Sequence, residues 1–202
     1  LLGGRDGILS LIASLLGVTA LILVARGDVA GQALTIVFSI LYAIVSFDLH
    51  YYGEMITYLC MSAPMAAFSV VSWLRHPYAE DHSEVRMTRL KRSVAVLTVL
   101  LSLVVTAIFF LILRSLGNAE LLVSTVSVTT SFLAAFLLFL RSPWYALAYA
   151  ANDVVLIVLW IIAAMDDVSY LSMVACFLMF LCNDLYGFFN WLKLRRKQDA
   201  GL

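Results

Sequence analysis

The sequence predicts an all-α integral membrane protein with seven transmembrane helices. Hydrophobic residues make up 63% of the 202-residue chain, and the mean hydropathy is +1.00. Charged residues make up 13%, against about 25% in a soluble domain. The apolar residues fall in runs of about 20 residues, the length at which an α-helix crosses about 30 Å of hydrocarbon. Composition and run length together favour a multi-pass membrane protein.

Seven apolar runs follow one another with short connections. Five runs contain no Asp, Glu, Lys or Arg: Ile8–Ala25, Val29–Phe47, Met55–Leu74, Ser93–Leu113 and Leu121–Leu140. The last two runs, Ser142–Met165 and Val168–Leu192, each contain one carboxylate, Asp153 or Asp184. The very short turns at residues 26–28, 141–143 and 166–167 predict antiparallel neighbouring helices. Residues 75–92 form the one long polar loop.

The basic residues predict the orientation in the cell membrane, because cytoplasmic loops retain Lys and Arg. With seven spans, the opposite side receives only Arg5 and Arg114. The cytoplasmic side receives all the others: Arg26, Arg75, Arg86, Arg89, Lys91, Arg92, Arg141, Lys193, Arg195, Arg196 and Lys197. We therefore expect a cytoplasmic C-terminus and an external Leu1. Because residue 1 is not Met, a further upstream helix is left open, and it would place the N-terminus inside.

An internal repeat is visible in the order of short motifs. ILVAR, YYGEM and SVVSW in the first three helices correspond to FLLFLR, SYLSM and GFFNW in the last three. A single helix between the triplets returns the chain to its starting side, so both triplets have the same orientation. This pattern predicts a 3+1+3 parallel repeat of the SWEET type, with a solute path between the repeats.

The repeat predicts five regions. Residues 1–75 form the first three-helix repeat, 76–92 a cytoplasmic loop, 93–116 a linker helix, 117–193 the second repeat and 194–202 a cytoplasmic tail.

Two Asn-Asp pairs, Asn152-Asp153 and Asn183-Asp184, lie at membrane depth. Such groups are costly in lipid unless they face a wet cavity or satisfy one another, so they are candidates for substrate contact. No Lys or Arg lies at the same depth, and burial therefore favours neutral carboxyl groups. Neighbours on a helix lie about 100° apart, so one member of each pair faces a path, and we expect Asn152 and Asn183 to do so. The alternative for both pairs is an interhelical hydrogen bond that holds the bundle together.

Tyrosines accompany these polar groups at helical spacing. Tyr149 lies on the same stripe as Asn152, and Tyr186 on the same stripe as Asn183. Aromatic rings stack on a flat ring or attract its positive charge, and the candidates are Tyr42, Tyr58, Tyr149 and Tyr186. Glu54, one stripe position from Tyr58, is a candidate for the outer mouth or simply an interfacial residue.

Three tryptophans lie at helix ends, where an aromatic belt at the membrane surface is the expected arrangement. These are Trp73, Trp144 and Trp191.

Several classes of protein do not fit the sequence. A retinal protein needs a membrane-embedded lysine, but Lys91, Lys193 and Lys197 lie at the cytoplasmic edge. No His, Asp or Glu cluster has the spacing of a metal or acid-base site, so we expect neither an enzyme, nor a metal, nor a cofactor. No phosphate-binding loop is present for ATP, and we expect no nucleic-acid partner.

The motifs resemble the PnuC family of vitamin-precursor carriers over nearly the whole chain. The matching segments are Leu41-Tyr42-Ala43 through Phe47, Tyr51-Tyr52-Gly53-Glu54-Met55, Asn152 within YALAYAAND, and Asn183 with Tyr186-Gly187 and Trp191. The resemblance implies facilitated uptake of nicotinamide riboside by alternating access, in a homo-oligomer with a trimer as the expected state. A carrier of thiamine or riboflavin and a SWEET-type sugar carrier are the alternatives. Proton coupling through Asp153 or Asp184 is left open.

Overall fold

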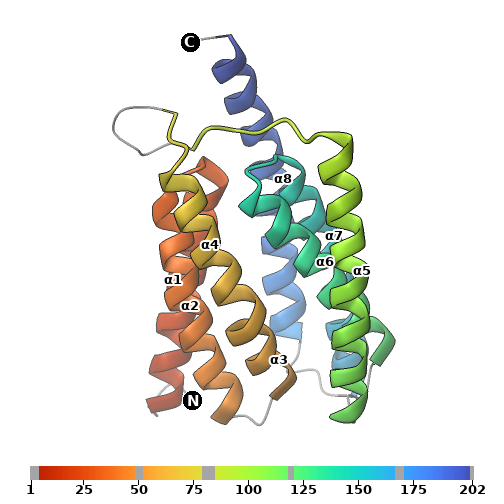
Figure 1. The fold of residues 1–202 in the computed structure, drawn as a ribbon. Helices are drawn as coiled ribbons and strands as arrows, with labels where there is room; N and C mark the ends of the chain where they lie inside the picture. Colours follow the sequence, from red (N-terminus) through yellow and green to blue (C-terminus); the bar gives the residue numbers. More distant parts are fainter. Residues whose placement is uncertain (1–4, 49–51, 79–84, 118–120, 167–170, 201–202) are drawn as a thin grey trace. The chain divides into compact units, whose positions relative to one another are not determined.

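The computed structural model describes residues 5–48, 52–78, 85–117, 121–166 and 171–200, and Figure 1 shows its helices. The helices are α1 Arg5–Arg26, α2 Val29–Asp48, α3 Tyr52–Thr57, the π-helical turn η1 Tyr58–Ser62, α4 Ala63–Leu74, α5 Arg92–Ser115, α6 Leu121–Phe139, α7 Trp144–Asp166 and α8 Leu171–Asp199. Since α3, η1 and α4 follow without a break, the described residues form seven continuous helical segments. The predicted all-α architecture is confirmed.

The helices are apolar enough for a bilayer. Among the described residues, Met55–Leu74, Arg92–Ser115 and Leu121–Phe139 meet both the length and the hydropathy of a membrane span. Leu15–Arg26, Val29–Ile44 and Trp144–Leu159 are apolar helical stretches of 10–17 residues. These segments overlap six of the seven predicted runs.

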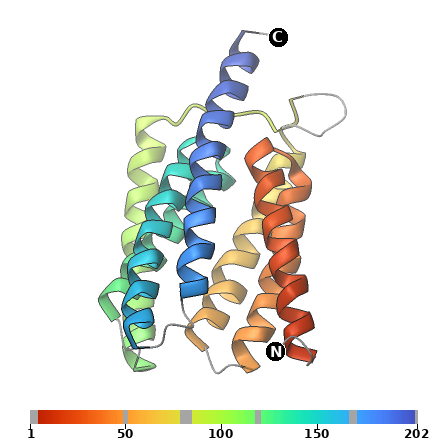
Figure 2. The same ribbon diagram turned by 180° about the vertical axis from the view of Figure 1, so that it is seen from behind.

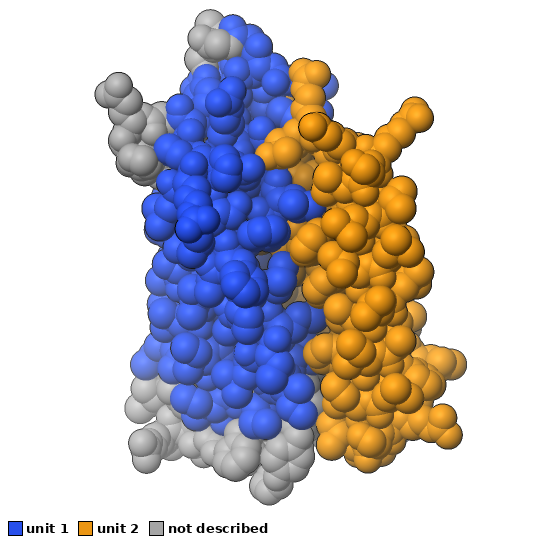
Figure 3. Space-filling model, in the orientation of Figure 1, with its two compact units in different colours: residues 1–87, 139–141, 193–202 blue, residues 88–138, 142–192 orange. Residues whose placement is uncertain are grey.

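The chain divides into two compact units, coloured separately in Figure 3. Unit 1 comprises residues 1–87, 139–141 and 193–202, and unit 2 comprises residues 88–138 and 142–192. Helix α5, the expected linker, groups with the last three helices in unit 2. The 3+1+3 repeat and its parallel sense stay predictions.

Helices α1 and α2 lie side by side in unit 1 (Figures 1 and 2) because small residues line their contact. Ala20 is 2% exposed, and a Cβ added at Gly31 would lie 2.5 Å from the backbone nitrogen of Val24. The connecting turn passes through Gly27 at φ +79°, and the Asp28 carboxylate accepts a 2.8 Å hydrogen bond from the Ala30 N–H. This geometry fits the predicted antiparallel turn.

The third helical segment of unit 1 is interrupted by the π turn, and Pro64 explains it. Proline has no N–H, and its ring clashes with the carbonyl group four residues earlier, here that of Cys60. The Ala63 N–H donates to the Tyr58 oxygen, five residues back, so the chain widens by one residue just before Pro64. The widened turn begins at Tyr58, one of the predicted site residues.

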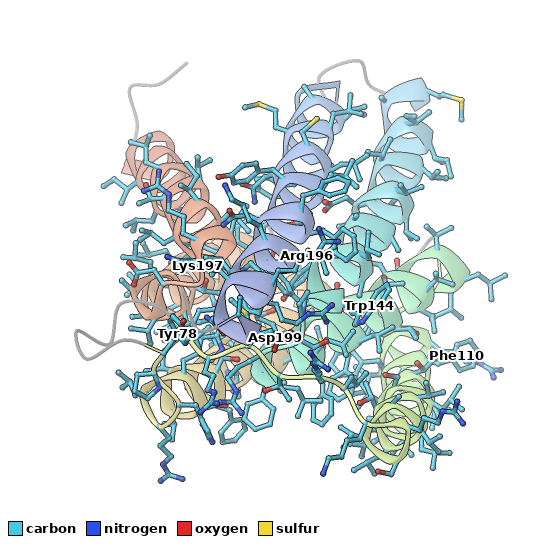
Figure 4. All side chains as sticks on the ribbon, turned by 90° about the horizontal axis from the view of Figure 1, so that it is seen from above. Tyr78, Phe110, Trp144, Arg196, Lys197 and Asp199 are labelled. Atoms are coloured by element: carbon cyan, nitrogen blue, oxygen red, sulfur yellow. The ribbon has the colours of Figure 1, made fainter. Side chains whose placement is uncertain are left out.

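The predicted tail continues helix α8 to Asp199, and its end packs within unit 1. The Gln198 Oε1 accepts a 2.8 Å hydrogen bond from the Met87 N–H, and its Nε2 donates to the Val85 carbonyl oxygen at 3.0 Å. The Val85 N–H in turn donates to the Gly27 carbonyl oxygen at 3.1 Å. Figure 4 looks down on this end, where Arg196 and Lys197 are labelled.

Arg141, in the turn after α6, adopts a left-handed conformation with φ 59°. Burial, followed by the nearby charge of Arg86, lowers the pKa of Arg141. An arginine nevertheless keeps its charge in proteins, so this turn holds a half-buried cation at a helix end.

The tryptophans correct one expectation. Trp73 is 1% exposed and Trp191 is 0% exposed, whereas Trp144 is 49% exposed. A belt residue must reach the membrane surface, so the belt prediction is wrong for Trp73 and Trp191 and fits only Trp144. Trp191 packs instead on Tyr145 inside unit 2, with ring centroids 4.6 Å apart.

Candidate functional site

Asn152 on α7 is held by two hydroxyl groups of α6. Its Oδ1 accepts hydrogen bonds from Ser127 Oγ at 3.0 Å and Thr130 Oγ1 at 2.8 Å. The Thr130 hydroxyl also lies 3.0 Å from the Val126 carbonyl oxygen of its own helix. Two donors fill both lone pairs of the amide oxygen, so the NH₂ group is the part of Asn152 that can address another molecule. The interhelical bond left open by the sequence is therefore present, and substrate contact stays a prediction.

Asp153 on α7 and Asp184 on α8 form a carboxyl pair. They are 4% and 6% exposed, and their carboxyl groups interact electrostatically with each other. Asn183 also hydrogen-bonds to Asp184. Asp153 Oδ2 is buried without a hydrogen-bond partner within the described residues.

The adjacent residues Asn152 and Asp153 contact different helices. Asn152 accepts hydrogen bonds from α6, whereas Asp153 interacts electrostatically with Asp184 of α8, because side chains one residue apart point about 100° from each other. Both are buried, so burial does not select one of them as the path-facing member. On α8 the more buried member is Asp184, and Asn183 is half-buried.

Tyr149 completes what we call the unit 2 polar cluster, which consists of Tyr149, Asn152, Asp153, Asn183 and Asp184. The half-buried Tyr149 phenol interacts electrostatically with both carboxyl groups. Its ring lies 6.2 Å from that of Tyr145, centroid to centroid. The cluster thus offers amide, phenol and carboxyl groups from two neighbouring helices.

Tyr186 lies apart from this cluster. It is 57% exposed, two positions after the buried Asp184 and so on another face of α8. The buried Gly187 lies on the same turn. The structure does not bring Tyr186 together with the carboxyl pair.

Two of the predicted residues of unit 1, Tyr42 and Tyr58, form an aromatic group with Phe38. The Tyr42 and Tyr58 ring centroids are 4.4 Å apart, and Phe38 lies 5.5 Å from Tyr42 and 5.9 Å from Tyr58. Tyr58 reaches this group from the π turn. The Glu54 side chain lies outside the described residues.

Two buried polar residues of α2 were not predicted. Gln32 is 1% and Ser39 is 0% exposed, and neither Gln32 Nε2 nor Ser39 Oγ has a hydrogen-bond partner within the described residues. They lie seven positions apart and thus on one helix face. Gln32 is the one amide side chain in residues 29–47, and this isolated polar residue in an apolar run could have marked it as a candidate site residue.

Ser127 and Thr130 were also missed. They belong to STVSVTTS, residues 124–131, where six of eight residues carry a hydroxyl group. That density within an apolar run was a usable signal for hydrogen bonds between helices. A neighbouring bond of 2.7 Å joins Thr129 on α6 to Thr106 on α5.

An apolar helical fold with amides and carboxyl groups buried in mid-helix is typical of an integral membrane transporter. Comparison with known proteins supports this class. A sequence model of the family described as nicotinamide mononucleotide transporter matches residues 7–193. The chain belongs to this family, and it is a transporter rather than an enzyme.

Individual relatives agree with the family. The nicotinamide riboside transporter PnuC of Neisseria mucosa is 26% identical over 199 residues, which are 96% of this chain and 76% of the relative. Its namesake in Haemophilus influenzae is 24% identical over 195 residues, covering 96% and 83%. A solved structure described as the crystal structure of the Vitamin B3 transporter PnuC matches with a TM-score of 0.74 and 26% identity, covering 96% of this chain and 89% of the other. The predicted family resemblance is confirmed.

Proposed function

We propose that this protein carries nicotinamide riboside across the cell membrane by facilitated diffusion with alternating access. The two relatives named nicotinamide riboside transporter PnuC each align with 96% of this chain. The charge distribution supports a multi-pass arrangement with the C-terminus in the cytoplasm. The unit 2 polar cluster supplies groups of the chemistry that this solute needs.

The carboxyl pair of Asp153 and Asp184 favours the riboside over the mononucleotide. A phosphate carries about −1.5 to −2 charges at pH 7 and is recognised by Arg, Lys or backbone N–H groups. Residues 121–140 and 144–191 contain no Lys, Arg or His. A phosphate beside two buried carboxyl groups would be repelled, whereas the pyridinium ring of the riboside carries one positive charge. This pair is the observation that carries the proposal.

The other members of the cluster suit the neutral parts of the riboside. The Asn152 NH₂ group can donate to a carboxamide oxygen or a ribose hydroxyl group, and Asn183 offers the same chemistry. Tyr149 can contribute a cation–π contact of about 0.5–2 kcal/mol to the ring. Tyr42, Tyr58, Tyr186 and Glu54 stay candidate contacts on the sequence argument.

The competing solutes differ in charge. Riboflavin and a sugar are neutral, and neither uses a buried carboxyl pair as counter-ion. Thiamine is a cation and fits the pair as well as the riboside does, so the names of the relatives favour the riboside here. We further propose a homo-oligomer, with a trimer as the expected state, embedded in the bilayer.

Uptake of labelled riboside into liposomes containing the full chain tests this function. We expect saturable entry without ATP or an ion gradient, with competition by unlabelled riboside and little competition by the mononucleotide. Asn152→Ala and Asn183→Ala should each weaken entry by about tenfold, the effect of roughly 1.4 kcal/mol.

A matched control is Thr98→Val, because Thr98 is buried on α5 and its hydroxyl donates to Val94 of its own helix at 2.8 Å. This variant should transport like the parent chain. Entry that both Asn variants leave unchanged would remove these residues from the site. Stronger competition by the mononucleotide than by the riboside would refute the substrate assignment.

A further inference from the structure

We propose that Gln198, near the end of α8, closes a latch on residues 85–87 that opens each time the carrier opens toward the cytoplasm. This inference rests on the proposed function, because it assigns a moving contact to the alternating-access cycle. We call the contact of Gln198 with Val85 and Met87 the α8 latch.

The Gln198 amide pairs with the backbone of residues 85–87 at two points. Its Oε1 accepts a hydrogen bond from the Met87 N–H at 2.8 Å, and its Nε2 donates to the Val85 carbonyl oxygen at 3.0 Å. The Val85 N–H donates in turn to the Gly27 carbonyl oxygen at 3.1 Å. One side chain of α8 therefore holds a segment that is itself fixed to the turn between α1 and α2.

Leu194 adds an apolar contact at the same place. A Cβ added at Gly27 would lie 3.6 Å from Leu194 Cδ1. The same point lies 3.3 Å from Met87 Cε and 3.8 Å from Val85 Cγ1. Leu194 and Gln198 are four positions apart and thus on one face of α8. The last turns of α8 contact unit 1 through this face.

Helix α8 belongs to both compact units. Its residues up to 192 group with unit 2, and its residues from 193 group with unit 1. Residues 188–199 contain neither Gly nor Pro, which are the usual causes of a kink. The end of α8 therefore moves with the part of the helix that lies in unit 2.

A small tilt of α8 is enough to open the latch. Gln198 lies about 9 Å along the helix axis from residue 192, so a tilt of about 10° at that residue displaces it by about 1.5 Å. Such a displacement lengthens bonds of 2.8 and 3.0 Å beyond hydrogen-bonding distance.

The same helix carries Asn183 and Asp184 of the unit 2 polar cluster. In alternating access, one half of the carrier rocks against the other so that the site faces each side in turn. A movement that takes α8 along with unit 2 must bend this helix or separate Gln198 from residues 85–87. Two side-chain hydrogen bonds break more easily than an unkinked helix bends, so the latch is the contact that opens.

The double variant Met87→Cys and Gln198→Cys allows the latch to be closed covalently. The purified full-length chain is treated in detergent micelles with ethylene-bridged bis(methanethiosulfonate), a short thiol cross-linker that a reducing agent removes. The mass of the joined tryptic fragments verifies the link, and the chain is then reconstituted into liposomes. The cross-linked chain should lose uptake of labelled riboside down to the protein-free background, and reduction should restore it.

The matched control is the double variant His76→Cys and Arg86→Cys. Both side chains are exposed, and the Arg86 N–H donates to the His76 carbonyl oxygen at 2.9 Å. This cross-link ties the same segment to the chain just after α4 and leaves α8 free, so uptake should stay at the level before cross-linking. The parent chain, with its three native cysteines, receives the same reagent and should also keep its uptake.

Amide hydrogen exchange on the parent chain gives a second measurement that needs no substitution. If the latch opens during the cycle, saturating riboside should change the exchange rate of the amides of residues 85–87 by about threefold or more. A permanent anchor would give the same exchange rate with and without riboside.

The outcomes separate the latch from the proposed function. Unchanged uptake by the chain cross-linked at positions 87 and 198 overturns the latch and leaves the carrier function standing. If this double variant is inactive before cross-linking, hydrogen exchange decides, and a rate that riboside does not alter overturns the latch. If the parent chain takes up labelled thiamine and no riboside, the substrate assignment fails and the cross-link is judged on thiamine uptake. A parent chain that takes up neither refutes both.

Discussion

The two hydroxyl donors that hold the Asn152 carbonyl oxygen can be removed one at a time. Thr130→Val removes the 2.8 Å bond at nearly constant shape, and Ser127→Ala removes the 3.0 Å bond. Hydrogen bonds between membrane helices contribute about 0.6 kcal/mol on average and up to about 1.7. Each single change leaves the oxygen one donor, so we expect a loss of about 0.6–1 kcal/mol in the free energy of unfolding. The double change leaves a buried acceptor with neither donor, which costs about 1–3 kcal/mol more.

Removing either hydroxyl donor should also weaken riboside binding. If these bonds orient the Asn152 NH₂ group toward the substrate, losing about 0.6–1 kcal/mol weakens riboside affinity about threefold to fivefold in each single variant. A double-mutant cycle on thermal unfolding and on affinity measures the coupling between the two donors. Thr98→Val, which removes a hydroxyl bonded within its own helix, should change neither quantity much. Strictly additive losses with unchanged affinity would refute the view that Ser127 and Thr130 act together on Asn152.

Two further changes test the packing of unit 1. Gly31→Ala should lower the free energy of unfolding by about 3 kcal/mol, because its Cβ would lie 2.5 Å from the Val24 backbone nitrogen, and only separation of α1 from α2 relieves that contact. Gly17→Ala, whose Cβ meets the Phe38 side chain at 3.0 Å, should cost clearly less in the same thermal unfolding assay, and equal losses would contradict this account. Gln198→Leu removes both hydrogen bonds from α8 to residues 85–87 and should speed tryptic cleavage after Arg86, while an unchanged cleavage rate would show that these bonds do not hold the segment.

The helical plan of this protein is predictable because it is encoded locally. Long uncharged runs have no stable alternative to helices in lipid. The turn at Gly27 was predictable because a glycine lies between a basic and an acidic residue there. The seven helical segments follow these runs closely. The chemistry of the site was also visible, because Asp153 and Asp184 are the lone carboxylates of their runs.

The contacts between helices were harder to predict. A hydroxyl group in an apolar helix usually bonds a carbonyl oxygen of its own turn, as Thr98 does. Thr130 also reaches Asn152 on another helix, and the residue type alone does not distinguish these two cases. Tryptophan at a helix end fits both a membrane surface and a packed interior, and the deep burial of Trp191 depends on Tyr145, which lies far away in the sequence. Such choices depend on tertiary packing, which periodicity does not report.

A one-residue deletion inside a membrane helix ordinarily turns every later side chain by about 100°. The turn at Tyr58–Ser62 already contains one residue more than an α-helical turn, and that surplus depends on Pro64. A homologue that lacks Pro64 and has one residue fewer in this turn would keep an unbroken helix. Its side chain at the position of Tyr58 would no longer point toward Tyr42. Length variation among homologues is therefore expected to fall at this turn, and the choice of ring presented there can change without any change of fold.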